Sequence, residues 1–454
     1  MIKKVNVKWL VLIAIGTGSF MSALDVSVVN IILPVLRQTF NSDVASIEWV
    51  ITVYLLAISS LLLTFGRLGD LKGHKRIYLL GFALFITSSI LCGSAWSSTS
   101  LIVFRGLQAI GGAMLASNSP AIVTANFPAE ERGRAFGLVS TMTYLGLTIG
   151  PSLGGWLTQT FSWQTVFYIN IPVGLLALTL SARYIPKDKP ADSSKRFDLP
   201  GSVTFMVGLT ALMLGLNKGA EWGWGSPAVL GLLVGALLLL VLFIWIEQRS
   251  SAPMLDLSLF RIPLFSTSTA SAVLNYISIY SIIFLMPFYL IQGRNLDPAT
   301  AGLLLTAQPV MMAIAAPISG ALSDRFGSRG MGMIGMSILA AGLFMLSFIR
   351  LETGLWQVVV GLVVAGLGTG IFISPNTSAL MGAAPKARQG IASGVQAIAR
   401  NFGMVLGIGL AGAILTTNLT AQTADALFKG VGMGFLAAAG VAALGVVTSA
   451  IKEK

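Results

Sequence analysis

Long apolar segments recur along the chain, and each is long enough to cross a lipid bilayer. A transmembrane helix needs about 20 mostly apolar residues, and fourteen such segments occur, six on each side of a central pair at 199–217 and 227–246. The outer sets cover residues 9–35, 47–66, 77–96, 98–126, 135–159 and 163–184, and then 264–292, 299–322, 331–349, 355–382, 390–417 and 429–450. The pattern predicts an all-α integral membrane protein with fourteen transmembrane helices.

Composition and charge agree with a membrane protein. Of the 454 residues 55% are hydrophobic and only 10% are charged, against about 25% charged in soluble domains. The net charge is +12, and the basic residues are unevenly distributed between the two sides of the predicted membrane. The termini and alternate loops hold 22 Lys and Arg residues, whereas the opposite loops hold five, namely Arg37, Lys218, Arg294, Arg350 and Lys429. This positive-inside bias predicts cytoplasmic termini and explains the charge without a nucleic-acid partner.

The two outer sets of segments are related by an internal repeat. The sequences "GRLGDLKGHK" (66–75) and "GALSDRFGSR" (320–329) share one pattern at an offset of 254 residues. An offset of 254 residues corresponds to about eight helices, two more than a six-helix unit contains. The central pair is therefore interpreted as an insertion between two related units. We therefore expect a six-helix bundle at 1–190, two inserted helices at 191–250 and a second six-helix bundle at 251–454. Duplicated six-helix units are a transporter architecture, with the substrate site between the repeats.

The acidic residue Asp25 lies deep inside a predicted span, in "SALDVSVVN" (22–30). A charge at mid-helix costs about 2.5 to 3.5 kcal/mol, so intramembrane acids usually face a cavity or a partner. Arg105 is predicted at a similar depth in the fourth span, where it could interact with Asp25 directly or through water. Two interpretations stay open at this point, a static ion pair between two helices and a carboxylate that exchanges a proton.

Four motifs occur in order along the chain: "LDVSVVNIILP" (24–34), "GRLGDLKGHKR" (66–76), "RGLQAIGGA" (105–113) and "GLTIGPSLGG" (146–155). They resemble the signatures of the major facilitator superfamily, specifically of its fourteen-helix drug:proton antiporter group. The resemblance implies a proton-coupled exporter of amphipathic, cationic compounds, with Asp25 as the proton-exchanging group and Arg105 tuning it. It also implies a monomer in a bacterial cytoplasmic membrane, which needs no cofactor because the proton gradient supplies the energy.

The resemblance further implies two sets of gating residues. In the loop motif an aspartate helps to close the cytoplasmic gate by facing the positive N-terminus of a helix; this set comprises Gly66, Asp70, Gly73, Lys75 and Arg76, with Asp324 as a weaker counterpart. In the helix-5 motif, glycines on one face and a proline that favours a bend are expected between the halves; these are Gly146, Gly150, Pro151 and Gly154. Positive-inside bias and ordinary small-residue packing are the alternatives.

Substrate-binding candidates come from the helices that line the central cavity of the resembled family. They comprise Asp25, Gln108, Tyr276, Tyr280, Phe284, Gln308, Asn376, Gln396 and Arg400. An aromatic stripe is more often packing than a binding surface. Arg400 either binds an anionic or carbonyl-bearing substrate or is satisfied by backbone carbonyls and snorkelling. A cationic substrate could compete with a proton for Asp25.

Other functional classes find little support. The only histidine, His74, lies in a loop, and a single intramembrane aspartate cannot form an aspartyl dyad, so an intramembrane enzyme is disfavoured. The lone Cys92 excludes an internal disulfide and a cysteine metal cluster. A channel is disfavoured by the repeat and the gate motifs. The closest alternatives are an exporter of a metabolite or a lipid and a proton symporter.

Overall fold

The computed structural model describes residues 7–42, 44–187, 198–223, 225–250, 255, 257–296, 298–418 and 424–451. These residues form helices joined by short turns, and none of them lies in a strand. The first six spans are α1 (Val7–Thr39), α2 (Val44–Lys72), α3 (His74–Gly93), α4 (Ser98–Asn126), α5 (Arg132–Thr160) and the pair α6 (Thr165–Tyr168) and α7 (Asn170–Tyr184). Two further helices follow, α8 (Leu199–Trp222) and α9 (Pro227–Arg249).

The remaining six spans follow a short 3-10 turn. They are α10 (Pro263–Pro287) with a π-helical extension (Phe288–Gly293), the pair α11 (Pro298–Leu305) and α12 (Ala307–Phe326), α13 (Ser328–Leu346), α14 (Leu355–Ala383), α15 (Gln389–Asn418) and α16 (Ala424–Ala450). Thirteen spans in the described ranges are long and apolar enough to cross a membrane. The fourteenth is α5, whose 29 residues are long enough and whose glycines, serines and threonines lower its hydropathy. The predicted all-α fold with fourteen helices is confirmed.

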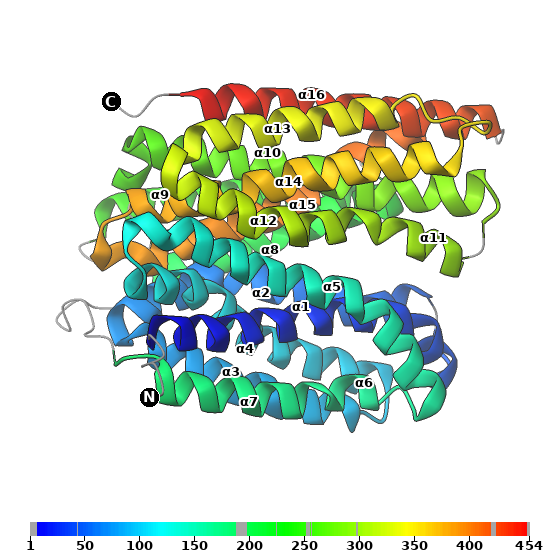
Figure 1. Ribbon diagram of the computed structural model, residues 1–454. Coiled ribbons are helices and arrows are strands. Elements are labelled where there is room, and N and C mark those ends of the chain that lie inside the picture. The colour runs from blue at the N-terminus through cyan, green and yellow to red at the C-terminus, as the bar shows by residue number, and fades with distance from the viewer. Residues whose placement is uncertain are drawn as a thin grey trace, which may run out of the picture.

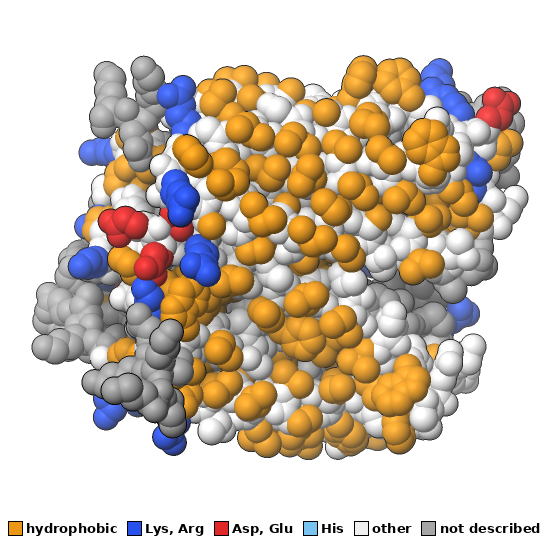
Figure 2. All heavy atoms as spheres, viewed as in Figure 1, with side chains coloured by type: hydrophobic (Ala, Val, Ile, Leu, Met, Phe, Trp, Pro, Cys, Tyr) orange, Lys and Arg blue, Asp and Glu red, His pale blue; other side chains and the backbone are white. Residues whose placement is uncertain are grey.

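The helices run side by side, and the ends of the chain lie together. In Figure 1, α1 begins and α16 ends at the same side of the bundle, which we call the terminal end. Hydrophobic side chains cover the middle of the visible face, whereas Lys, Arg, Asp and Glu side chains gather at the two ends (Figure 2). This distribution is the one that a bilayer requires, with an apolar belt between two polar surfaces.

Each half packs mainly within itself. In the first half α1 packs against α5 and α7, and α4 packs against α2 and α3. In the second half α13 packs against α14 and α16, and α10 packs against α15. Contacts between the halves run chiefly through α5 with α12 and through α2 with α15, while α8 packs against α9, α2 and α15.

The repeat is visible in the backbone. Gly73 and Gly327, which are 254 positions apart, both have positive φ values, +96° and +86°, and each directly precedes a helix. Only glycine adopts this conformation without a steric penalty. Two further pairs of glycines bring the halves into backbone contact: a Cβ on Gly66 or Gly390 would overlap the other residue, and the same holds for Gly133 and Gly320. Both crossings lie near the terminal end.

Candidate functional site

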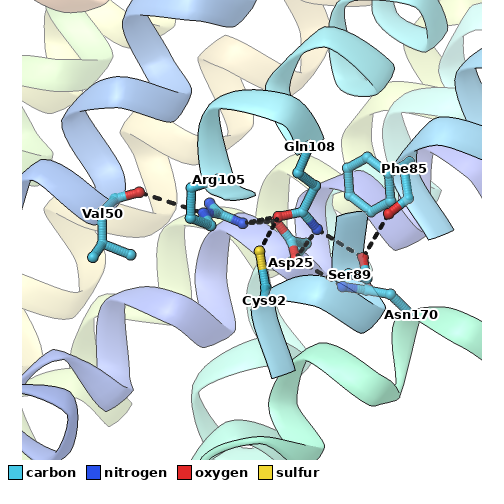
Figure 3. Close-up of polar contacts among 8 residues, drawn as sticks. All are labelled: Asp25, Val50, Phe85, Ser89, Cys92, Arg105, Gln108 and Asn170. Atoms are coloured by element: carbon cyan, nitrogen blue, oxygen red, sulfur yellow. Dashed lines mark hydrogen bonds and ion pairs between the residues drawn. The ribbon is translucent and has the colours of Figure 1, made fainter. Parts of the chain in front are cut away.

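Asp25 lies at the centre of a buried polar network in the first half (Figure 3). Arg105 Nη1 donates to Asp25 Oδ2 over 2.7 Å. Gln108 Nε2 and Asn170 Nδ2 both donate to Asp25 Oδ1, over 3.0 and 2.7 Å. Helices α1, α4 and α7 thus converge on one carboxylate, and three donors satisfy its charge.

The partner groups are themselves held in place. Arg105 also donates to the Gln108 Oε1 atom (2.6 Å) and to the Val50 carbonyl (3.3 Å). Its guanidinium carbon lies 4.2 Å from the centre of the Tyr54 ring, in cation–π contact. Gln108 Nε2 donates to Ser89 Oγ as well, over 2.8 Å. The network therefore fixes the orientation of the guanidinium and of the amide.

Water does not reach this network in the conformation observed. Asp25 and Arg105 are each 1% exposed, and Gln108 and Asn170 are equally enclosed. Every group around the Asp25 oxygens is a donor, which suits an ionised carboxylate. For the carboxyl group to gain or lose a proton, at least one of these contacts has to open. The sequence allowed Asp25 and Arg105 to interact either directly or through water, and the structure shows the direct contact.

The sequence analysis missed several members of the network, three of which have side chains that contact its charged or amide groups. Asn170, Tyr54 and Ser89 lie in apolar segments and look like isolated polar or aromatic residues in sequence. Asn170 carried a signal, because an asparagine amide inside a span needs a partner. Its helix, α7, contacts α1, a neighbour that no sequence motif indicates. Gln108 was expected to bind substrate, but its amide lies in this network.

Two other carboxylates join the halves at the terminal end. Asp70 on α2 accepts hydrogen bonds from the backbone N–H groups of Gly390 (2.9 Å) and Ile391 (3.1 Å), at the N-terminus of α15. Asp324 on α12 accepts from the N–H groups of Gly133 (2.8 Å) and Arg134 (2.9 Å), at the N-terminus of α5. Each carboxylate satisfies free N–H groups and faces a positive helix end. We call these contacts the two latches.

The other residues of the loop motif have local roles in this conformation. Lys75 Nζ donates to the carbonyls of Ala182 (2.8 Å) and Ile185 (2.5 Å), at the C-terminus of α7 in the same half. Arg76 is exposed. The His74 ring lies between Asn118 Oδ1 (2.8 Å) and the Asp70 carboxylate (3.3 Å). Of the gating residues predicted in this loop, Gly66 and Asp70 contact the second half.

The glycines of the helix-5 motif are not at the interface between the halves, which corrects the expectation. A side chain on Gly146, Gly150 or Gly154 would overlap Phe20, Ser27 or Val28, all of which lie on α1 in the same half. α5 uses its glycine face to approach α1 closely, and its other face packs on α12. α5 runs as one helix through Pro151, whose side chain lies outside the described ones.

Arg400 lies between the halves, and it has no carboxylate partner among the described residues. It is 11 positions after Gln389, the first residue of α15, or about 17 Å along the helix. Its guanidinium makes one long hydrogen bond, from Nε to Asn401 Oδ1 at 3.5 Å. A charged group inside a membrane span usually faces a partner or a water-filled cavity, and half-buried Arg400 is placed to face such a space between the halves.

Tyrosines from both halves lie near this part of α15. A Cβ on Gly403, three residues after Arg400, would overlap the side chain of Tyr276 on α10, and Tyr276 and Tyr280 pack against the hydrophobic cluster that contains Tyr144 of α5. Arg400 is close enough to these three tyrosines and to Tyr54 of α2 to influence them electrostatically. Tyr276, Tyr280 and Arg400 are half-buried. The structure therefore brings together three of the residues predicted to bind substrate and adds two tyrosines that the sequence analysis did not consider.

The remaining candidates for substrate binding have other partners in the second half. Asn376 donates to the Ser268 carbonyl (3.0 Å), and Gln396 donates to Thr377 Oγ1 (2.7 Å), both within the second half. Phe284 packs on Phe288, with ring centres 5.1 Å apart. Buried Gln308 keeps an amide nitrogen without a partner among the described residues.

Solved structures establish the same fold. The human organic anion transporter MFSD10 (TETRAN) matches 97% of this chain and 99% of its own length, with a TM-score of 0.69 and 15% identity. The proton:xylose symporter XylE matches 97% of this chain and 94% of its own, with a TM-score of 0.65 and 14% identity. At these identities the likeness concerns the architecture alone.

Sequence relatives extend the comparison. Riboflavin transporter RibZ of Clostridioides difficile is 34% identical over 91% of this chain and 89% of its own. Multidrug resistance protein Stp of Mycobacterium tuberculosis is 35% identical over 91% and 76%, and the tetracenomycin C resistance and export protein of Streptomyces glaucescens is 32% identical over 90% and 76%. A sequence model of the Major Facilitator Superfamily matches residues 15–270 and 268–452. The chain is a multi-pass membrane transporter and belongs to the Major Facilitator Superfamily.

Proposed function

We propose that this transporter exports amphipathic small molecules in exchange for protons, by alternating access, and that Asp25 is the group that carries the proton. The observation that supports this most strongly is the network around Asp25. An acid buried at this depth, shared by α1, α4 and α7 and paired with Arg105, is a feature that intramembrane proton pathways use.

Alternating access requires a gate on each side of the membrane. The two latches are well suited to be the gate at the terminal end, because each joins a carboxylate of one half to a helix N-terminus of the other. The positive-inside bias favours a cytoplasmic location for this end, in a bacterial cytoplasmic membrane. The structure would then represent a state closed toward the cytoplasm, from which the latches open to admit cargo.

The chemical class of cargo is less constrained. The expectation of a cation that competes for Asp25 has no support in this geometry, because both carboxylate oxygens are occupied and the group is buried. Relatives named for multidrug resistance and for tetracenomycin C export favour a toxic or antibiotic compound. A second candidate is the transport of a metabolite, which the relative named as a riboflavin transporter favours.

The proposal can be tested in liposomes that contain the purified full chain and an acidic lumen. Three aromatic probes are offered outside: fluorescein, an anion; rhodamine 123, a cation on a similar ring system; and riboflavin, which is uncharged. Antiport predicts that at least one probe accumulates inside as protons leave. Asp25→Asn keeps an acceptor for Arg105 but cannot exchange a proton, so the accumulation driven by the gradient should be abolished.

A matched control removes a carboxylate from the surface. Glu352 is exposed in the turn before α14, and Glu352→Gln should transport as the unmodified chain does. Accumulation that persists in Asp25→Asn would refute the role of Asp25. Uptake that requires an acidic exterior instead would indicate symport.

A further inference from the structure

The cluster of Arg400 with its four tyrosines is rich in donors and poor in acceptors. A guanidinium carries five N–H groups, and Arg400 uses one of them, in a long contact with its neighbour Asn401. The hydroxyls of Tyr144, Tyr276 and Tyr280 make no hydrogen bond within the described part of the chain. These groups come from α5, α10 and α15, and hence from both halves of the molecule.

The charges nearby do not compensate Arg400. The acid that faces Tyr54 from the other side, Asp25, is paired with Arg105. Asp25, Arg105 and Arg400 together carry one net positive charge, and that charge resides on Arg400. The arrangement therefore lacks an acceptor, and a cation placed beside it would be repelled.

We infer that Arg400 is the anchor for the cargo, and that the cargo is an aromatic compound bearing a negatively charged or carbonyl oxygen. This inference rests on the proposed function, since it names the cargo of the same transporter. The oxygen would accept hydrogen bonds from the guanidinium, and the half-buried rings of Tyr276 and Tyr280, which lie four residues apart on one face of α10, would contact the aromatic part.

Such a cargo makes no ion pair with Asp25, so it cannot exchange with a proton by direct competition. Tyr54 links the two sites instead. Its ring stacks on Arg105, and it interacts electrostatically with Asp25, Arg105 and Arg400. Under this proposal, coupling between the proton and the cargo would run through α2, the helix that carries both Tyr54 and Asp70 of one latch.

The inference is tested by binding, with the full chain in lipid nanodiscs and without any gradient. Fluorescein and rhodamine 123 are titrated while their fluorescence anisotropy is measured. The unmodified chain should bind fluorescein more tightly than rhodamine 123. Arg400→Gln should weaken fluorescein binding by about tenfold or more, the contribution of a hydrogen bond to a charged group, and should leave rhodamine 123 binding unchanged or tighter.

Two further variants separate binding from folding and from bulk charge. Arg400→Lys keeps the charge and should restore part of the affinity for fluorescein. Arg37→Gln removes an equal charge from an exposed position at the end of α1 and should have no effect. Preference for rhodamine 123, absence of saturable fluorescein binding, or equal fluorescein affinity in Arg400→Gln and the unmodified chain overturns the inference. Because no gradient is present, failure of proton coupling does not affect this result.

Discussion

A single carboxylate in the membrane is tolerable when its surroundings supply the hydrogen bonds that water would make. Asp25 receives three donors, from Arg105, Gln108 and Asn170. These contacts replace the hydrogen bonds that water would make to the carboxylate, so each donor should contribute to holding the network in place. Asn170 is a suitable position for testing this relation, because it is neutral and contributes one bond.

Asn170→Ala removes one donor from the ionised carboxylate and leaves the Arg105 ion pair intact. The loss of one hydrogen bond to a charged group, about 1.5 to 3 kcal/mol, should weaken the buried network and lower the rate of gradient-driven probe uptake, measured in the liposome assay. Ser88→Ala, which changes a buried hydroxyl of α3 that does not contact Asp25, serves as the control. An unchanged uptake rate in Asn170→Ala would show that this donor does not contribute to the working of the network.

Helix ends and helix crossings determine how the halves meet. At the terminal end, each latch combines a carboxylate, a helix N-terminus and a pair of glycines without room for a Cβ atom: Gly66 with Gly390, and Gly133 with Gly320. The close approach of the backbones brings the N–H groups within reach of the carboxylates. A small increase in size at a crossing should therefore weaken its latch.

Gly390→Ala should favour opening of the terminal end, because the added methyl group overlaps the backbone of Gly66. Overpacking costs about 1 to 3 kcal/mol, which corresponds to an increase of roughly 5- to 150-fold in the ratio of open to closed molecules. Spin labels at Lys72 and Arg329, exposed residues of the two halves, in a Cys92→Ser background would report the distance between the halves.

Gly409→Ala is the matched control for this experiment. Gly409 lies on the same helix, α15, and a Cβ there would meet no atom within 4 Å. The distance distribution of this variant should equal that of the unmodified chain. If Gly390→Ala also leaves the distribution unchanged, the glycine crossing does not hold the gate closed.

The limits of prediction from sequence are clear at the scale of elements. Hydrophobic segments and the 254-residue repeat indicated the fourteen helices, because each span needs a fixed length of apolar sequence. The face that a helix presents to a given neighbour was not predictable: the glycines of α5 face α1, not the second half. Small residues reveal that a close approach exists but carry no information about the partner.

At the scale of the whole molecule, the charged groups are placed at different levels. The latches lie at the terminal end, the buried network around Asp25 lies within the first half, and Arg400 lies between the halves. Sequence motifs indicated Asp25, Arg105 and Asp70, since each motif carries its own charged residue. The tyrosines near Arg400 come from three helices, α2, α5 and α10, and only the tertiary structure brings these helices together.

The account depends on a change in the protonation of Asp25, and infrared difference spectroscopy of the full chain in nanodiscs tests it most directly. The pH is lowered from that of the cytoplasm to that of the more acidic outer side of an energised membrane. Over this range the unmodified chain should gain the carbonyl band of a protonated carboxylic acid. That band should be absent in Asp25→Asn and present in Glu352→Gln. A spectrum of the unmodified chain that lacks the band, or a band that persists in Asp25→Asn, would contradict the account.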